Sequence, residues 1–401
     1  MKASVGFVSS RAGFHSDGIW SEAGVVRPLQ ALAERYGRLT VALSSSPERS
    51  PLLCEHLAGD EADAVELPWM PSVRVGLRRW RGARRAIREV ERRCDVLVVQ
   101  IPFDSPLALL GARRPRVYHI CADAREWILS STRYRGLLGL PARVVARGID
   151  RLQAALLSEP RTAYVANGEA IDRWYGGRGR VVISSALRDS EILSVQRRRP
   201  LGDGFRVLFV GFLRHEKGLD TLVAAFKILL EALPQAELEI VGAAHTVDQG
   251  VGSQLERELA DLRAAGKARI LPALPFGPEL FQRYADADVL ALPSRSEGTP
   301  RVLVEARAFR CPVVATRVGG IPSSIDDGED GLIVPVDDPS ALARALERVA
   351  ADSNLRAHLV ERGLERARRA TVEVFSSVLV EAIEDLVPDA RRGQKLVRAS
   401  R

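Results

Sequence analysis

Short apolar segments rich in β-branched residues alternate with longer segments of helical periodicity along almost the whole chain. Most of the apolar runs are nearly continuous and end at Gly, Pro or polar residues, which is typical of strands buried on both faces of a sheet. Helical segments between such strands predict parallel sheets built from βαβ units, and therefore an α/β fold. The predicted strands are 4–10, 38–44, 95–101, 116–120, 162–166, 181–184, 205–211, 236–242, 268–273, 288–293, 311–316 and 331–335.

This pattern stops and restarts near the middle of the chain. Residues 186–204 lose the apolar periodicity and are rich in charge, Pro and Gly. A chain of 401 residues is long enough to form two hydrophobic cores. We therefore predict two Rossmann-like, doubly wound domains facing a cleft, over 1–190 and 191–370, then a helix at 371–388 and a disordered basic tail at 389–401.

The composition indicates which kinds of partner and which cellular compartment to expect. Lys and Arg exceed Asp and Glu by 58 − 51, a net charge of +7, which favours anionic partners without choosing among them. The four cysteines form no C-x-x-C pair, as expected for free thiols in a reducing compartment. No apolar stretch approaches about 20 residues, and the first residues lack a signal-peptide pattern. We expect a cytoplasmic protein, with peripheral attachment to the inner face of a membrane as an alternative.

The first candidate site segment, 210–222, joins a predicted strand to a helix. The strand ends at Gly211, the loop carries Arg214 and Lys217, and the helix opens after Gly218. Backbone N–H groups at a helix N-terminus, with cations beside them, suit an anionic diphosphate. A solvated basic loop is the alternative interpretation.

The second candidate segment carries two acids eight residues apart, Glu297 and Glu305. We expect Glu297 in the loop above the carboxyl end of a strand, where ligands of open α/β sheets bind. Thr299 is predicted to cap the following helix, with Pro300 at its first position. Glu305, about two turns into that helix, is suited to accept hydrogen bonds from a vicinal diol such as ribose, or to pair with Arg301.

Two arginines of this helix stand where small or apolar residues are usual. We expect Arg307 to extend toward solvent or the rim of the cleft. Arg310 falls at the helix end, where a cation interacts favourably with the helix dipole. Glycine is the residue favoured just after a helix, and we expect its replacement by Arg310 to cost about 1 kcal/mol of stability.

Together these segments carry a family resemblance. The stretches "VGFLRHEKG", "YADADVLALPS", "SEGTPRVLVEA" and "PVVATRVGGIP…DGEDGLIVP" occur in this order over about 205–370. This half of the chain resembles the nucleotide-sugar domain of the family 4 retaining glycosyltransferases, which have the GT-B fold. The resemblance implies that the C-terminal domain binds a nucleotide-diphosphosugar donor and that the N-terminal domain binds most of the acceptor. The helix at 371–388 resembles the family's final helix, which crosses back over the first domain.

The resemblance also implies roles for single residues. Lys217 and Arg214 would hold the donor diphosphate. Glu297 would contact the transferring sugar, and Glu305 would bind the ribose. The full set of implied donor-binding residues is Gly211, Arg214, Lys217, Glu297, Gly298, Thr299 and Glu305, with a wall formed by the turn at Gly319 and Gly320. The chain departs from the family pattern at Phe212, where an arginine is frequent, and at Ser323, where a glutamate is frequent. It also has Phe309 and Arg310 where the family usually has a small residue and a glycine.

The first half offers weaker candidates. His119 falls where members of the family often place a histidine near the donor sugar and acceptor, and we expect it to be catalytic. Asp123 could line the same site, a register shift of two would put Cys121 there instead, and a core histidine is the structural alternative. Gly13 and Gly18 lie at the position of the family's glycine-rich loop, where backbone would approach the acceptor or a phosphate.

Residues 77–93 predict a strongly basic amphipathic helix. Leu77, Trp80, Ile87 and Val90 fall at helical spacing, and arginines dominate the other faces. A surface helix with a solvated basic side is one interpretation. Peripheral docking on an anionic membrane that carries a lipid-linked acceptor is the other.

The resemblance implies transfer of a sugar, with retention of anomeric configuration, from a UDP- or GDP-sugar to a hydroxyl of a sugar, lipid-linked or small-molecule acceptor. Cell-surface glycan, glycolipid or secondary-metabolite synthesis is the expected context. Glu297, His119 and Lys217 are the implied catalytic residues, and no metal or other cofactor is expected. A nucleotide-sugar 2-epimerase of the same fold is the enzymatic alternative. A non-catalytic protein that binds an acidic polymer or RNA is the other alternative, although an aromatic content of 5% argues against a nucleic-acid partner.

Overall fold

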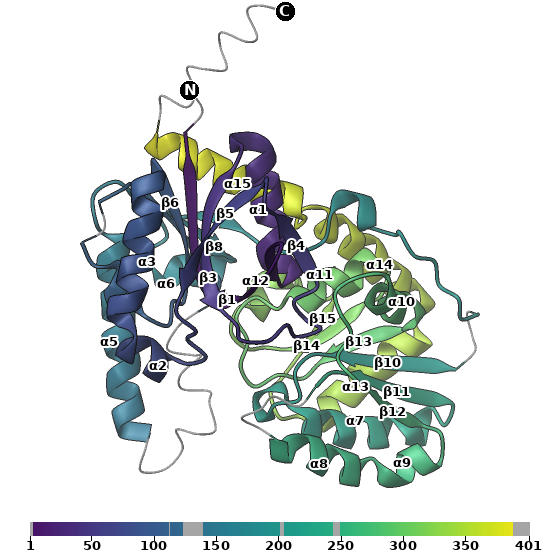
Figure 1. The fold of residues 1–401 in the computed structure, drawn as a ribbon. Coiled ribbons are helices and arrows are strands. Elements are labelled where there is room, and N and C mark those ends of the chain that lie inside the picture. Colours follow the sequence, from purple (N-terminus) through teal and green to yellow (C-terminus); the bar gives the residue numbers. More distant parts are fainter. Residues whose placement is uncertain (1–2, 112, 123–138, 201–203, 244–248, 388–401) are drawn as a thin grey trace, which may run out of the picture. The chain divides into compact units, whose positions relative to one another are not determined.

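The computed structural model of the chain describes residues 3–111, 113–122, 139–200, 204–243 and 249–387. The chain forms two compact α/β units, Met1–Ala186 with Val372–Arg401, and Leu187–Thr371 (Figure 1). The first unit ends at Ala186, where the segment 186–204 loses its apolar periodicity. The chain returns to the first unit at Val372, the start of the last helix. The predicted basic tail at 389–401 lies outside the described residues. None of the described helices is both long and apolar enough to cross a membrane.

The first unit contains a parallel run of strands in the order β5-β3-β1-β6-β7-β8-β9. The chain winds outward from β1 on one side and from β6 on the other. The topological switch point, where ligands of such sheets bind, is therefore between β1 and β6. The strands are β1 Val5–His15, β3 Leu39–Ser45, β5 Ala62–Leu67, β6 Val96–Ile101, β7 Arg116–Ile120, β8 Thr162–Asn167 and β9 Arg180–Val182.

Helices cover both faces of this sheet (Figure 1). One face packs against α3 (Trp80–Arg93), the 3-10 turn η1 (Pro106–Leu109), α5 (Gly139–Leu157) and α6 (Glu169–Trp174). The other packs against α1 (Ala23–Tyr36) and α15 (Val372–Leu386). Phe375 and Leu379 of α15 are buried in this second core, so the last helix of the chain completes the first unit. A short helix α2 (Val73–Arg78) precedes α3.

The glycine-rich loop predicted near the N-terminus is instead part of the sheet. Strand β1 continues to His15 and turns into the antiparallel β2 (Gly18–Ser21), which pairs with β4 (Glu55–Ala58). A Cβ atom at Gly13 would lie 2.7 Å from the Cβ of Leu43, and one at Gly18 would lie 2.4 Å from the carbonyl oxygen of Leu57. Both glycines therefore permit close packing within the protein, which a glycine signal in the sequence cannot distinguish from close approach to a ligand.

The second unit repeats the winding of the first. Its parallel strands have the order β12-β11-β10-β13-β14-β15, so the switch point is between β10 and β13. The strands are β10 Phe205–Val210, β11 Ala236–Val241, β12 Ala268–Leu271, β13 Val289–Leu292, β14 Val313–Thr316 and β15 Leu332–Val334. The helices are α7 Leu219–Ala232, α8 Gln249–Glu258, α9 Ala260–Ala264, α10 Pro278–Asp286, α11 Arg301–Ala308, α12 Ile321–Ser324, α13 Pro339–Ala351 and α14 Ser353–Arg368.

Helix α11 begins one residue later than predicted. Pro300 takes the N-cap position with extended backbone (φ −74°, ψ 118°), and no side chain caps the helix. Helix ends commonly shift by a residue between sequence patterns and structures.

The prediction that Arg307 extends toward solvent is wrong. Its side chain is 2% exposed, its Nη2 lies 2.6 Å from Asp330 Oδ1, and it donates to the carbonyl oxygens of Asp330 and Ser324. Helix α14 covers this face of α11, and Gly363 makes room, since a Cβ there would lie 3.0 Å from Arg307 Cγ. Burial lowers the pKa of Arg307 to about 10, partly offset by Asp330.

Arg310 follows the end of α11 in a left-handed conformation with φ 61°, and its side chain is exposed. Helices favour glycine at this position. The sequence analysis expected a cost here because the chain has Arg310 in place of that glycine.

Substitutions of Arg307 and Arg310 should change the stability of the protein in opposite directions. Arg307→Ala leaves the buried Asp330 with Arg366, at 2.9 Å, as its one ion-pair partner among the described residues, and should lower the free energy of unfolding by about 3 kcal/mol. Arg310→Gly relieves the left-handed strain and should raise it by about 0.5–1 kcal/mol. Urea unfolding followed by far-ultraviolet circular dichroism measures both. Equal midpoints for wild type and Arg307→Ala would contradict the buried ion pair.

Candidate functional site

Three loops meet at the switch point of the second sheet. They follow β10, β13 and β14, which are neighbouring parallel strands, so their carboxyl ends lie at one edge. The first loop contains the 3-10 turn η5 (His215–Lys217), and Gly211 opens it by donating its N–H to Val241 O at 3.0 Å. The second contains Glu297, Gly298 and Thr299 ahead of α11. The third contains Gly319 and Gly320 ahead of α12.

Two glycines let these loops touch through their backbones. Gly218 has a left-handed φ of 63°, and a Cβ there would lie 2.0 Å from the carbonyl oxygen of Pro293. A Cβ at Gly320 would lie 2.4 Å from the carbonyl oxygen of Gly298, to which the Gly320 N–H donates at 3.0 Å. Any side chain at either position would separate the loops.

An ion pair joins the first loop of this three-loop site to the second. Lys217 Nζ lies 2.6 Å from Glu297 Oε1, and Ser294 Oγ donates to the same oxygen at 2.7 Å. The Lys217 side chain is 20% exposed and that of Glu297 is 8% exposed. The structure therefore brings together the residues expected at the diphosphate and at the transferring sugar, with the lysine the more accessible of the two.

Arg295 links the same loops through hydrogen bonds, and the sequence analysis did not identify it. It donates to Asp220 at 2.7 Å, to Asp337 at 2.6 Å and to the carbonyl oxygen of His215 at 2.9 Å. Its own N–H donates to Glu216 O at 2.7 Å. Because it links the start of α7 to the loop that holds Glu297, Arg295 is a positioning residue. An arginine two residues before Glu297 is the only signal of this role that the sequence offers.

Arg214 lies beside the residues two positions before and two positions after it in the sequence, Phe212 and Glu216. Its guanidinium carbon is 5.2 Å from the ring centroid of Phe212, and its Nη1 is 3.4 Å from Glu216. Phe212 is 42% exposed. The aromatic ring that stands in the family's usual arginine position thus lies against the arginine expected to replace it.

Glu305 lies on α11 against α10. It is 6% exposed, and Oε2 accepts a hydrogen bond from the hydroxyl of Tyr284 at 2.7 Å. Burial raises the pKa of Glu305, while Arg301 and Tyr284 act in the opposite direction. Burial, with Glu305 nearby, also raises the pKa of Tyr284 well above its ordinary value. The ribose role of Glu305 stays a prediction, and Tyr284 is a partner that the sequence did not suggest.

The first unit places His119 in its core. His119 is 3% exposed within β7, and its ring centroid is 4.6 Å from that of Phe375. This placement favours the core alternative over a catalytic role. Cys121, just beyond the end of β7, is partly exposed, and its Sγ accepts a hydrogen bond from Gln100 at 3.1 Å. Asp123 lies outside the described residues.

Polar groups that the sequence did not single out lie at the β1–β6 switch point. The pairing of β1 with β3 shifts between Ser9 and Ala12, so Ser10 and Arg11 lie in a bulge of the kind common beside active sites. Asp104 follows β6, and its N–H lies 3.4 Å from Ser10 Oγ. Burial raises the pKa of Asp104 to about 6, partly offset by Ser10 and Arg11. Its position just after a buried strand could have identified it.

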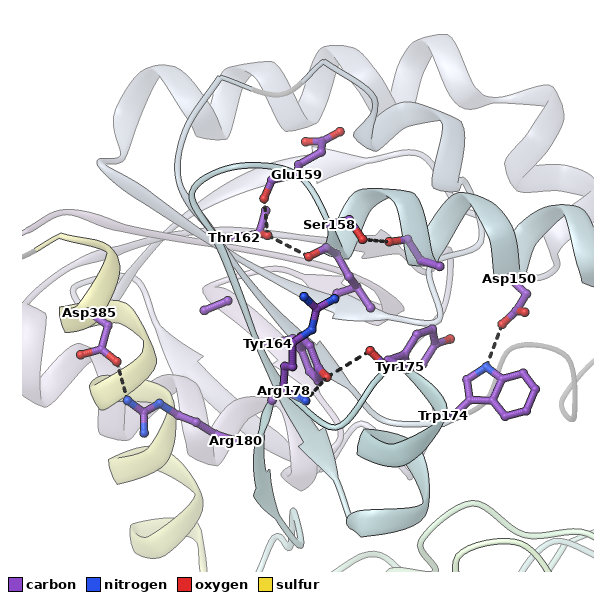
Figure 2. Close-up of a pocket in the computed structure, with 14 residues that line it drawn as sticks. Asp150, Ser158, Glu159, Thr162, Tyr164, Trp174, Tyr175, Arg178, Arg180 and Asp385 are labelled. Carbon is purple, nitrogen blue, oxygen red and sulfur yellow. Dashed lines mark hydrogen bonds and ion pairs between the residues drawn. The ribbon is translucent and has the colours of Figure 1, made fainter.

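A separate pocket of about 720 Å³ lies at the opposite edge of the first sheet, where β8 and β9 begin (Figure 2). Its polar groups are largely engaged with one another. Tyr164 Oη donates to the carbonyl oxygen of Tyr175 at 3.3 Å, and Trp174 Nε1 donates to Asp150 at 3.0 Å. None of the predicted site residues lines this pocket.

Comparison with curated proteins finds relatives that match about half of the chain. D-inositol 3-phosphate glycosyltransferase of Corynebacterium jeikeium is 35% identical over 211 residues, which cover 51% of this chain and 50% of that protein. The enzyme of the same name from Acidothermus cellulolyticus is 36% identical over 203 residues, covering 48% and 45%. The match thus spans about half the length of these relatives.

Solved structures match nearly the whole chain. Sucrose-phosphate synthase from Thermosynechococcus elongatus has a TM-score of 0.75 at 18% identity, covering 97% of this chain and all of that one. Anabaena Alr3699/HepE in complex with UDP and glucose has a TM-score of 0.68 at 18% identity, covering 95% and 99%. These likenesses confirm the predicted GT-B fold.

The model of the glycosyl transferases group 1 family matches residues 194–366. This range contains all three loops of the site. The part of the chain that carries the candidate site is therefore similar to the glycosyl transferases group 1 family.

Proposed function

We propose that this chain transfers a sugar from a nucleoside-diphosphate sugar to an acceptor hydroxyl. The observation that carries the proposal is the Lys217–Glu297 pair at the switch point of a glycosyl transferases group 1 domain. The names of the curated relatives support the reaction class, and a neighbouring structure holds UDP and glucose.

In the proposed mechanism the cations of the first loop bind the diphosphate. Lys217 is the more exposed partner of its ion pair, so an arriving diphosphate can compete with Glu297 for it. Arg214 and the backbone N–H groups at the start of α7 add positive charge in the same loop. As the bond between sugar and diphosphate breaks, negative charge grows on the leaving group, and these groups stabilise it without a metal.

Glu297 would orient the sugar in this scheme. Its second oxygen is available while Ser294 holds the first, so it can accept hydrogen bonds from sugar hydroxyls. The resemblance to retaining enzymes favours attack from the face that the diphosphate leaves, with a diphosphate oxygen taking the acceptor proton. The anomeric configuration would then be retained, which proton NMR of the product tests directly.

The acceptor would bind at the β1–β6 switch point of the first unit. Arg11 and Asp104 give this edge both a cation and a carboxyl group, suited to a polyhydroxylated or phosphorylated molecule. D-inositol 3-phosphate is the first acceptor to test because the curated relatives are named for it.

A thermal-shift screen of UDP, GDP, ADP and TDP identifies the base, and incubation of the matching sugar donors with and without acceptor tests the reaction. Transfer to the acceptor supports the proposal. Release of an epimerised sugar from donor alone would identify an epimerase instead. Failure of every nucleoside diphosphate to stabilise the protein would favour a non-catalytic binding protein.

Lys217→Ala should weaken nucleoside diphosphate binding and lower kcat by at least about 10²-fold, because it removes a cation from the leaving group. Lys227→Ala is the matched control, since it removes an exposed lysine from the adjoining α7. Isothermal titration and steady-state rates measure the two effects. Equal values for both variants would refute the role of Lys217.

Glu297→Ala should separate binding from turnover. It frees Lys217 from its ion pair, so nucleoside diphosphate affinity should stay the same or rise. Turnover should nevertheless fall by about 10²-fold because the sugar loses its orienting carboxylate. A parallel loss of affinity and turnover would show that Glu297 acts only by holding the loop.

The raised pKa of Asp104 predicts that the stability of the first unit depends on pH. Its folded pKa of about 6 lies above the ordinary 3.8, so ionisation penalises the folded state, and its contribution to stability falls as pH rises from about 4 to about 6. Asp104→Asn should stabilise the first unit by about 1–3 kcal/mol near pH 8, and the gain should shrink toward about pH 4. The exposed Asp60→Asn is the control.

Tryptophan fluorescence is the probe for this measurement because all five tryptophans fall in the first unit. A gain that is the same at acid and alkaline pH would contradict the raised pKa.

A further inference from the structure

The basic helix predicted at 77–93 is divided at Arg79 between α2 and α3, and the outer side of α3 carries a charged groove. Arg81, Arg84, Arg85, Arg88 and Arg92 of α3 line a groove of about 520 Å³ together with Trp80. The opposite side of the helix, with Ala83, Ile87 and Val90, is buried in the core of the first unit. The arginines therefore form a stripe along the outer side of α3.

Most of these arginines have no ion-pair partner among the residues that the structure describes. Arg84, Arg85 and Arg88 form no ion pair with the residues that the structure describes. Of the two acids on α3, Glu89 pairs with Arg92 and Arg93. The other, Glu91, is 7% exposed and accepts the Arg113 N–H at 2.8 Å.

Exposed apolar side chains lie on neighbouring elements of the same side. Leu107 and Leu110, at η1, are 38% and 37% exposed, and Val144 and Val145 of α5 are 64% and 44% exposed. η1 contacts both α3 and α5, and all three elements cover the same face of the first sheet. Half of the eight exposed large apolar side chains in the described residues are in these two segments, so they form a local concentration.

More exposed arginines accompany these apolar residues. Arg143, Arg147 and Arg151 fall at intervals of four along α5, and their side chains are exposed. They too form no ion pair among the residues that the structure describes. The outer sides of α3, η1 and α5, called here the arginine face, thus combine uncompensated positive charge with exposed Leu and Val.

We propose that the arginine face docks on a bilayer that contains anionic phospholipids. Cations attract the negatively charged headgroups, and exposed apolar side chains bury themselves at the boundary with the acyl chains. A nucleic acid would use the cations but gain little from Leu107, Leu110, Val144 and Val145. A second copy of the chain is disfavoured because a symmetric contact would place like charges opposite one another.

Vesicle sedimentation tests the proposal with the full chain. Vesicles of phosphatidylcholine with about one third phosphatidylglycerol should bind the protein at low salt and release it at high salt, whereas pure phosphatidylcholine should bind weakly. Arg84→Gln with Arg85→Gln and Arg88→Gln should lower the partition coefficient about 10²-fold, since each arginine near the surface contributes about fivefold. Replacing the same three residues by lysine should retain binding.

Leu107→Ser with Val144→Ser should lower the partition coefficient about 10-fold with no change in charge. The matched control replaces Arg257, Arg263 and Arg344 of the second unit by Gln, which removes the same charge from exposed positions elsewhere. Circular dichroism verifies that each variant folds, and a run without vesicles detects self-association.

Three results would overturn the proposal. One is the absence of binding to anionic vesicles at low salt. Another is an equal loss of binding in the control variant. The third is binding to single-stranded RNA with no binding to vesicles, which would assign the arginine face to nucleic acid. None of these readouts depends on sugar transfer, so the docking surface and the proposed function can fail separately.

Discussion

The geometry of the candidate site depends on a backbone contact between the loops that follow β10 and β13. Gly218 approaches the carbonyl oxygen of Pro293 so closely that any Cβ would collide with it. That contact brings the end of η5 to the loop after β13, where Lys217 and Glu297 form their ion pair. Arg295 then links the loop to Asp220 and Asp337, so pairs of side chains 42, 75 and 80 residues apart along the chain are held at one junction. A small residue at the sheet edge thus determines where the charges lie.

The sequence was most informative where a residue's environment follows from the strand–helix alternation. The α/β class, the restart near residue 190 and the positions of Glu297 and Lys217 at strand ends follow from periodicity and from loop position. Partners contributed by distant segments were not accessible in this way. Tyr284 for Glu305, Asp330 for Arg307 and Phe375 for His119 each lie on an element whose packing the local pattern does not specify. Arg307 is the clearest case, because α14 covers a helix face that the sequence placed at the surface.

The candidate site residues of the second unit were easier to predict from the sequence than those of the first. In the second, glycines, cations and acids occur at the loop positions expected for the proposed nucleotide-sugar site, and the family match covers this region. In the first, the glycines of the N-terminal segment support a β-hairpin, and the polar groups at the switch point arise from a bulge and from one aspartate. A bulge leaves no distinct signature in composition, because ordinary residues form it. Acceptor recognition by a shared fold is therefore harder to infer than donor recognition.

Helix α15 has a further consequence for the way the chain folds. Its buried Phe375 and Leu379 complete one of the two cores of the first unit, although the 185 residues of the second unit separate α15 from the last strand of the first unit. During synthesis, the second unit is fully available before the first can close its core. The exposed face of the N-terminal sheet, lined by Val5, Val98 and Val117, must then wait for the last helix to emerge. A chain that lacks only α15 would therefore have one complete unit and one open sheet, a natural substrate for a chaperone.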